Sequence, residues 1–291
     1  MTGIVVVGDA GLDVVARHDE PLPHGGDARA QIRFTGGGAG ANTALWLRSL
    51  GADTTLVARI GDDSGGRLIK AELEATGVRC AFAVDPEAAT CCVVVMVDAE
   101  GQRSMLADRG ANKRFRPEDV TPEALAGASH LHLSGYVLLD PSSRPAGLAA
   151  LAAAKEAGLT TSVDPQAAAH IHDPAAFLDD VRGTDLLMPN TEELVALTGS
   201  TDPLSAKELL GTVGAVVVTA GLGGAAWVDA HGVTTVPAVE AVCVDSTGAG
   251  DAFDAGVLTT WLAGQSTVDV LRAGTRLGAL AVSRLGPQPS A

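Results

Sequence analysis

The sequence predicts an α/β protein with a mostly parallel sheet covered by helices on both faces, and two observations lead to this fold class. The first segment, Gly3–Gly8, is an uninterrupted apolar run, which is typical of a strand buried on both sides. From Thr121 onward, short apolar strands alternate with longer helical segments, as repeated β-α units require. The chain of 291 residues is long enough to bury one large core of this kind.

The N-terminal part contains two stretches that interrupt this alternation. Residues 14–35 include Pro21 and Pro23 among short alternating pieces, which indicates a hairpin outside the main sheet. A second hairpin is expected around the turn at 98–101. The other elements expected here are the strands of that hairpin (Cys91–Val97 and Gln102–Ala107), a glycine-rich segment at 36–42, a helix from it through Leu50 that Gly51 ends, a strand at Thr54–Ile60 and a helix at Ser64–Thr76.

The C-terminal part follows a regular order of strands and helices. Thr121 and Pro122 open a short helix as its N-cap and first residue. The elements expected after it are the strand His130–Leu133, the helix Ser143–Ala157, the strand Thr160–Val163, a helix from Asp173-Pro174, the strand Asp185–Met188, a helix opened by Thr191, the strand Ala215–Thr219, a turn at Gly221–Gly224, and helices at about 249–263 and 267–285.

Candidate functional residues follow the predicted strands. In open parallel sheets, ligands bind beyond the carboxyl ends of the strands, so residues at these positions are expected to converge on one edge. Asp13 lies in the loop expected after the first strand. The other candidates at strand ends are Asp164, Asn190, Gly221 and Asp251.

The most informative stretch is Asp245-Ser246-Thr247-Gly248-Ala249-Gly250-Asp251. The apolar run before it, Val239–Val244, predicts a strand, and the segment after it, Ala252–Leu262, predicts a helix. A glycine turn between a strand and a helix start gathers backbone N–H groups and the positive end of the helix dipole, so it can bind a phosphate without a lysine. Asp251 has two interpretations from this stretch alone: a base for an attacking hydroxyl, or a helix-start residue that complements the dipole.

Composition limits the class of partner. The formal net charge of −15 disfavours nucleic acid or an anionic membrane surface as the main partner. No segment has the form of a secretory signal, and no apolar run reaches the ~20 residues that span a membrane. Cys80, Cys91, Cys92 and Cys243 follow no metal-site spacing and suggest no framework disulfide. We therefore expect a cytoplasmic protein.

Two stretches together resemble the signatures of the ribokinase-like carbohydrate kinase family, of the phosphofructokinase-B type. They are Gly37-Gly38-Ala39-Gly40-Ala41-Asn42 and the stretch from Asp245 to Phe253, and the resemblance extends over nearly the whole chain. It implies a Rossmann-like three-layer sheet with a small β-hairpin lid, and ATP-dependent phosphorylation of a sugar-like alcohol. The lid would comprise residues 13–35 and 89–110, and the catalytic domain residues 1–12, 36–88 and 111–291.

The resemblance also implies catalytic and substrate-binding roles. Asp251 matches the family's catalytic base. Asp13 matches the acid that binds hydroxyls of the substrate. The amides that match the anion hole belong to Gly248, Ala249 and Gly250, and the residues that match the other side of the sugar pocket are Gly37, Gly38 and Asn42.

Nucleotide and magnesium positions follow from two further matches. Asn190 and Glu193 fit the family's Asn-x-x-Glu motif, in which Asn190 would approach the phosphates and Glu193 would organise Mg²⁺ through water. Without the resemblance, Glu193 is explained as a first-turn glutamate of a helix capped by Thr191. The turn that resembles the family's site for the nucleotide phosphates contains Thr219, Gly221 and Gly224.

The C-terminal tail resembles the segment that encloses a monovalent cation beside the anion hole. The groups implied as K⁺ ligands are the Asp245 carboxylate, the Thr247 region, the backbone carbonyls of Ala281, Arg284 and Gly286, and the Ser290 hydroxyl. The same tail could equally be an ordinary chain end.

Some positions depart from the family's pattern. Ala39 stands where members often carry Lys or another polar residue, and Leu222-Gly223 where a basic residue is frequent. The segment from Asp164 to Ala168 has Gln166 and Ala168 in place of the usual Asn and Arg. Positive charge near the transferred phosphoryl would then come from elsewhere, and the candidates in the lid are Arg33, Arg103 and Arg109.

The resulting prediction is an ATP-dependent kinase that transfers the γ-phosphoryl group to a hydroxyl of a sugar or sugar acid. A nucleoside kinase of the same family is the alternative, although few aromatic residues (Phe34, Phe82 and Tyr136) are available to stack on a base. A non-catalytic sugar-binding protein and a dinucleotide-dependent oxidoreductase also compete. The dinucleotide fingerprint at 36–41 would normally follow the first strand directly, and here a hairpin intervenes.

The lid also predicts an oligomeric state. Val93, Val95 and Val97 lie on one side of a short hairpin that is too small to cover them. Pairing the lids of two subunits would bury these side chains, so we expect a homodimer.

Overall fold

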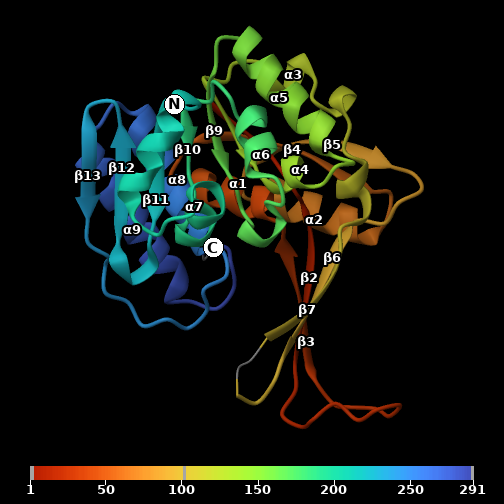
Figure 1. The fold of residues 1–291 in the computed structure, drawn as a ribbon. Coiled ribbons are helices and arrows are strands. Elements are labelled where there is room, and N and C mark those ends of the chain that lie inside the picture. Colours follow the sequence, from red (N-terminus) through yellow and green to blue (C-terminus); the bar gives the residue numbers. More distant parts are fainter. Residues whose placement is uncertain (1–2, 101–102, 290–291) are drawn as a thin grey trace.

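The computed structural model describes residues 3–100 and 103–289 and has a nine-stranded main sheet (Figure 1). Strand β1 lies between β4 and β8 and is parallel to both. The antiparallel pairs are β11 with β12 and β12 with β13, at one edge. In spatial order the strands are β13 (Gly232–Val236), β12 (Ala225–Asp229), β11 (Ala215–Thr219), β10 (Leu186–Leu187), β9 (Thr160–Asp164), β8 (His130–Ser134), β1 (Gly3–Val7), β4 (Asp53–Gly61) and β5 (Arg79–Asp85).

Helices cover both faces of this sheet, so the protein has three layers. On one face, α1 (Ala39–Ser49), α2 (Ser64–Ala75), α8 (Ala249–Leu262) and α9 (Thr267–Val282) enclose one hydrophobic core. On the other, α3 (Pro122–Leu125), α4 (Tyr136–Leu139), α5 (Arg144–Glu156), α6 (Pro174–Asp180) and α7 (Thr191–Thr198) enclose a second. The predicted α/β class with a mostly parallel sheet is thereby confirmed.

A second, four-stranded sheet projects from the body (Figure 1). Its strands, in spatial order, are β3 (Gln31–Gly37), β2 (Gly11–Arg17), β6 (Cys91–Val97) and β7 (Arg103–Asp108). The pairs β2–β3 and β6–β7 are antiparallel, as the two predicted hairpins require. The first lid segment was predicted at 13–35, whereas β2 begins two residues before it and β3 ends two residues after it. The division of the chain into a catalytic domain and a lid at the predicted limits stays a prediction.

The strand predicted at Val239–Val244 is wrong. The backbone there is irregular, and the amides of Val244 and Asp245 both donate to the carbonyl oxygen of Val282 at the end of α9. Val242 is 80% exposed, so the apolar run lies at the surface instead of in the sheet. The end of α9 thus holds the end of this segment, and among the described residues no strand pairs with it.

Smaller differences concern element ends and strands that the sequence did not indicate. β5, β12 and β13 were not predicted, because they belong to the sheet edges and lack a long apolar run. Asp13 lies within β2 and not in a loop, since the chain starts the lid sheet directly after Ala10. Asn190, not Thr191, is the N-cap of α7, and α9 ends at Val282.

The apolar surface of the lid also differs from the expectation. Val95 is only 8% exposed, and Val93 and Val97 are half-buried within the lid itself. The exposed apolar residues of the lid are Ile32, Phe34, Met105 and Leu106. Elsewhere, within the ranges described, none of the helices combines the length and the apolar character that a membrane span needs.

Candidate active site

A cavity of about 210 Å³ lies where the carboxyl ends of β9, β10 and β11 meet the N-terminus of α8. Parallel strands bring residues far apart in sequence to this edge, as expected for an open α/β sheet. Its walls include Thr219 from β11 and Ser246 from the loop before α8. The predicted residues that line it are Asp164, Asn190, Glu193, Gly248, Ala249, Gly250 and Asp251.

The N-terminus of α8 has the geometry expected of an anion site. Gly248 is the N-cap, with φ 75° and ψ 6°, a left-handed conformation that glycine adopts without strain. A Cβ at this position would also meet the carbonyl oxygen of Pro287 at 2.5 Å. The N-cap makes no side-chain hydrogen bond to the helix, and the backbone of Gly248, Ala249 and Gly250 lines the cavity at the positive end of the helix dipole. An oxyanion can bind there without a cationic side chain.

Asp251 lies in this first turn and is only 7% exposed. The Asn42 Nδ2 atom donates to its Oδ2 at 3.1 Å, and the Thr43 hydroxyl donates to its Oδ1 at 3.2 Å. Both donors belong to the first turns of α1, which follows the first glycine signature. The two signatures, some two hundred residues apart, therefore meet at the carboxylate of Asp251.

Burial raises the pKa of Asp251 to about 7, and the negative charge of Asp164 contributes to the increase. The hydrogen bonds from Asn42 and Thr43 act in the opposite direction, because they stabilise the ionised carboxylate. A carboxyl group with a pKa near neutrality accepts a proton more readily than an ordinary aspartate and is still partly ionised at pH 7. Its chemistry suits a general base.

Further acids surround the cavity. Burial raises the pKa of Asp164 and that of Asp254, which lies one helical turn after Asp251. The hydrogen bond between the two side chains raises the pKa of Asp254 further and acts to lower that of Asp164, so it favours the protonated form of Asp254 as the donor. Burial, together with the charge of Asp164, also raises the pKa of Glu193, to about 8. The cavity therefore gathers acidic groups whose ionised forms a bound cation would stabilise.

Glu193 also caps its own helix, as its position in the first turn allows. Its Oε2 accepts from the backbone N–H of Asn190 and its Oε1 from Asn190 Nδ2, both at 2.8 Å. In return, Asn190 Oδ1 accepts from the Glu193 N–H at 2.9 Å. The two residues form a capping box, and both also line the cavity. Glu193 therefore stabilises the start of α7 and lies at the candidate site as well.

The turn predicted for the nucleotide phosphates follows β11. Thr219 lines the cavity, and its carbonyl oxygen accepts from the Thr191 hydroxyl at 3.2 Å. Gly221 opens a single turn of 3-10 helix that Gly224 ends. These two glycines lie beyond the walls of the cavity, and Leu222 between them is 98% exposed.

The residues predicted for the acceptor lie at the root of the lid. Asp13 in β2 pairs with Thr35 in β3, and its carboxylate lies against Gly37. Burial raises the pKa of Asp13 to about 6. Gly38 is the N-cap of α1 with φ 96°, and a Cβ there would collide with the backbone of Asp9. The root of the lid and the start of α1 therefore fit closely around these glycines.

Arg109, at the end of the lid, is an ion-pair partner and not a solvated strand residue. Its Nη2 atom donates to both carboxylate oxygens of Asp9 at 3.0 Å, and its Nη1 donates to Asp140 at 2.7 Å. The guanidinium also lies 6.0 Å from the centre of the Tyr136 ring. These contacts tie the end of the lid to the loop after β1, through Asp9, and to both ends of α4, through Tyr136 and Asp140.

The tail approaches the second signature at the place predicted for a monovalent cation. The Oδ1 atom of Asp245 accepts from the Thr247 amide at 3.0 Å and from its hydroxyl at 2.7 Å. Its Oδ2 accepts from the backbone N–H of Gly286 at 3.0 Å. Ala281 lies in the last turn of α9, and its carbonyl oxygen accepts from the N–H of Arg284, just after the helix, at 3.1 Å. Ser290 lies outside the described residues.

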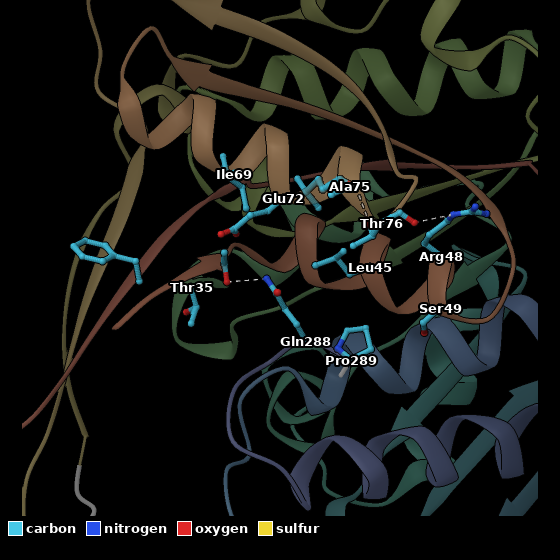
Figure 2. A pocket seen from close by; sticks show the side chains of 13 residues that line it. Thr35, Leu45, Arg48, Ser49, Ile69, Glu72, Ala75, Thr76, Gln288 and Pro289 are labelled. Atoms are coloured by element: carbon cyan, nitrogen blue, oxygen red, sulfur yellow. Dashed lines mark hydrogen bonds between the residues drawn. The ribbon is translucent and has the colours of Figure 1, made fainter. Parts of the chain in front are cut away.

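A larger cavity of about 670 Å³ lies beside the first signature, between α1, α2, β3 and the tail. Figure 2 shows Gln288 and Pro289 on one side of it and Ile69 and Glu72 of α2 on the other. Gln288 Nε2 donates to the carbonyl oxygen of Gly36 at 2.8 Å. Trp46 Nε1 donates to the Pro287 carbonyl at 2.9 Å, so the tail packs against α1 as well as against Gly248.

Sequence reasoning missed several groups at the site. Asp254 lies three residues after Asp251 on the same helix, so helical periodicity could have placed it near the base. The contact of Thr43, on α1, with Asp251 has no such signal. The contact of Asn42 with Asp251 has no local signal in the sequence, and the substrate-binding role of Asn42 stays a prediction.

Comparisons with known proteins agree with this geometry. The model of the pfkB family of carbohydrate kinases matches residues 1–291. An ATP-dependent ribose-1-phosphate kinase of Halopiger xanaduensis is 32% identical over 291 residues, which cover 98% of this chain and 94% of that protein.

Solved structures show the same ribokinase-like fold. The adenosine kinase of Sinorhizobium meliloti superposes with a TM-score of 0.89 and 25% identity, over 100% of this chain and 96% of that one. The ribokinase of Arabidopsis thaliana, solved in complex with ribose and ATP, has a TM-score of 0.83 and 27% identity, over 98% and 94% of the two chains. The chain therefore belongs to the pfkB family of carbohydrate kinases and is a phosphotransferase that acts on an alcohol group.

Proposed function

We propose that this protein is an ATP-dependent kinase that transfers the γ-phosphoryl group to a hydroxyl of a sugar or sugar acid, with Asp251 as general base. The observation that carries the proposal is the position of Asp251. Its buried carboxylate, with a pKa of about 7, lies in the first turn of α8 beside the uncapped helix amides. A base and an anion site within one helical turn suit the attack of a hydroxyl on a phosphorus atom.

In the proposed reaction, the acceptor hydroxyl gives its proton to Asp251 as its oxygen attacks the γ-phosphorus. The new O–P bond forms while the bond from the γ-phosphorus to the bridging oxygen breaks, and ADP leaves. Asn42 and Thr43 keep the carboxylate oriented through their hydrogen bonds. The amides of Gly248, Ala249 and Gly250 would bind the charge on the phosphoryl oxygens. Most of the catalysis is then positioning and electrostatic stabilisation.

The nucleotide would extend from the cavity towards the turn after β11. Asn190 and Thr219 would approach the phosphates from the cavity walls, and Gly221 and Gly224 would allow the chain to bend around them. The solved ribokinase with ribose and ATP supports the choice of ATP. Because ATP is an intracellular metabolite, the proposal includes a cytoplasmic location.

The donor set fits Mg²⁺ that keeps part of its water shell. All the acidic groups at the cavity offer oxygen, which Mg²⁺ prefers. Among the described residues, no three His, Cys, Asp or Glu side chains are arranged to hold a metal ion directly. Glu193 would therefore orient the ion through water, and the ion would neutralise charge on the phosphates.

The turn after α9 fits a K⁺ ion. Asp245 is drawn to this turn by the N–H of Gly286, so its charge lies beside the carbonyl-bearing segment. The carbonyls of Ala281, Arg284 and Gly286, the Thr247 region and the Ser290 hydroxyl would complete the shell. A cation there would offset the Asp245 charge and fix the loop that leads to Gly248.

The acceptor would lie between Asp13, Gly37 and Gly38 on the lid side and Asp251 on the other. Carboxylates that accept hydrogen bonds and glycines that allow close approach suit a compact polyol. A nucleoside is the second candidate, which the similarity to an adenosine kinase favours. Among the described aromatic residues, Tyr136 is the one whose ring lies beside these acids, so stacking of a base would rely on it.

The lid surface supports a homodimer as part of the proposal. Ile32, Phe34 and Leu106 are each more than half exposed, although they are large and apolar. In the sheet register, Phe34 and Leu106 share a face with Val14 and Val94. A partner lid packed on this face would remove it from water. Light scattering at micromolar concentration should give twice the monomer mass, and a monomeric mass would refute the pairing.

The experiment that tests the function combines binding with turnover. Thermal shift with sugars, sugar acids and nucleosides, with and without an ATP analogue, identifies acceptors, and ADP release measured by a coupled assay then ranks them. We expect the highest kcat/KM with a sugar or sugar acid in the presence of MgATP. Turnover of nucleosides alone would establish the second candidate, and no acceptor-dependent ADP release from any class would contradict the proposal.

A further inference from the structure

Gln166 has an unusual backbone conformation. Among the non-glycine residues that the structure describes, it alone has a positive φ, of 72°. For a residue with a Cβ, this left-handed conformation costs on the order of 1 kcal/mol or more. Such strain is retained where the surroundings impose it, and it concentrates at functional sites.

The loop around Gln166 is held from several directions. The backbone N–H of Gln166 donates to Asp164 Oδ1 at 3.0 Å, and the N–H of Gly135 donates to the Asp164 carbonyl at 2.7 Å. A Cβ on Gly135 would collide with the backbone of Asp164 and Pro165, so α4 starts directly against this turn. These contacts direct the Gln166 side chain into the cavity that it shares with Asp251.

The side-chain amide of Gln166 lies in the same cavity as Asp164 and Asp251. Its Nε2 donates to Asp164 Oδ2 at 2.5 Å, and the side chain lies close enough to Asp251 to lower the pKa of that carboxyl. An amide nitrogen carries two N–H groups and no charge, so it can join two acids without an ion pair. Asp164 and Asp251 would otherwise repel each other across a buried cavity.

We propose that Gln166 is a positioning residue for the transfer step, whose amide links Asp164 to Asp251 and fixes the orientation of the Asp251 carboxylate. This role rests on the proposed function of Asp251 as the base. It also explains the departure from the family's sequence pattern at this position. A neutral donor with a longer stem reaches both acids, and the adjacent Ala167 and Ala168 bring no charge.

Other groups that face Asp251 set its ionisation together with Gln166. From α1 these are the donors Asn42 and Thr43, and from β9 it is the charge of Asp164. The further titratable groups near it are Asp254 on its own helix, Glu193 on α7 and Tyr136 on α4. Gln166 differs from these groups because its amide donates to Asp164, lines the cavity beside Asp251 and does not titrate.

The test compares two replacements that separate the amide from the backbone strain. Gln166→Leu keeps a side chain of similar size and the strained backbone but removes the amide. Gln166→Gly removes the amide and the strain together. Gln265→Gly, at an exposed glutamine between α8 and α9, is the control and should behave as the unmodified protein. The assay is ADP release from pH 5.5 to 9.5 with the best acceptor, together with the KM for ATP and the melting temperature.

Both Gln166 variants should lose kcat at least tenfold, with the KM for ATP changed less than about threefold. The acid limb of kcat/KM should move to higher pH by about one unit, because a donor to the ionised carboxylate is lost. Gln166→Gly should melt at the same or a higher temperature. An unchanged acid limb in both variants, or recovery of kcat in Gln166→Gly alone, would overturn the role of the amide. If Asp251→Asn is inactive and both Gln166 variants behave as the unmodified protein, the positioning role of Gln166 is refuted and the proposed function stands. If Asp251→Asn is active, the role of Asp251 as general base is refuted.

Discussion

The hydrogen bond from Thr43 to Asp251 allows a small and well-controlled perturbation. Thr43 is buried in the first turns of α1, and its hydroxyl donates to Asp251 Oδ1 at 3.2 Å. Thr43→Val keeps the shape and the branching at Cβ and removes only the donor. Because the donor stabilises the ionised carboxylate, its loss should raise the pKa of Asp251.

The expected magnitude follows from the pKa of Asp251. At a pKa of about 7, about half of the carboxylate is ionised at pH 7. Loss of one hydrogen bond to a charged group, worth about 1.5 kcal/mol, raises the pKa by about one unit. About one-tenth of the base is then ionised at pH 7, so kcat/KM should fall about fivefold. Near pH 9 both proteins are almost fully ionised, and the difference should nearly vanish.

The assay is a pH profile of kcat/KM for the acceptor, with Thr55→Val as the matched control. Thr55 is a buried threonine of β4 whose hydroxyl has no hydrogen-bond partner among the described residues. Its replacement should leave the profile unchanged and should not lower stability. A Thr43→Val profile that is lowered equally at every pH, or an equal shift in Thr55→Val, would refute the reasoning.

Three further predictions concern other groups of the site. Asp13→Ala should raise the KM for the acceptor far more than the KM for ATP, because it removes hydrogen bonds to substrate hydroxyls, and equal effects on both constants would contradict its placement. In the metal-free and nucleotide-free protein, the free energy of unfolding should fall as pH rises from about 4 to about 8, because the pKa values of Glu193, Asp251 and Asp254 in the folded protein lie above their unfolded values. Asp254→Asn should make the melting temperature depend less steeply on pH. Activity at saturating Mg²⁺ should be several-fold higher in K⁺ than in Na⁺ or tetramethylammonium at equal ionic strength. Equal rates in the three salts would contradict the proposed K⁺ site.

Local patterns predicted most of the main sheet. β1 and β11 are continuous apolar runs buried on both faces, so their composition was sufficient to predict strands. α1 and α5 are followed by Gly51 and Gly158 and alternate with clear strands, so these signals were sufficient to predict helices. The run Val239–Val244 has the same composition as a strand but no partner beside it. Composition cannot distinguish the two cases, since pairing depends on where the rest of the chain lies.

The candidate site was predictable where a motif fixes the backbone. Gly248 adopts the left-handed conformation that the glycine signature suggests, and Asp251 follows in the first turn of α8. The direction of side chains across the cavity was not predictable in the same way. The contact of Asn42 with Asp251 and the position of Gln166 in the same cavity as Asp251 depend on the relative placement of α1, β9 and α8, which no local pattern encodes.

The role of Asp251 as general base is the central claim, and single-turnover kinetics of Asp251→Asn test it most directly. Asparagine keeps the shape and can keep a hydrogen bond to Thr43, so the fold and the affinity for MgATP should be little changed. Phosphoryl transfer to the acceptor should slow by about 10²- to 10⁴-fold, the usual contribution of a general base. A mutant that binds MgATP normally and retains a tenth or more of the transfer rate would show that Asp251 is not the base.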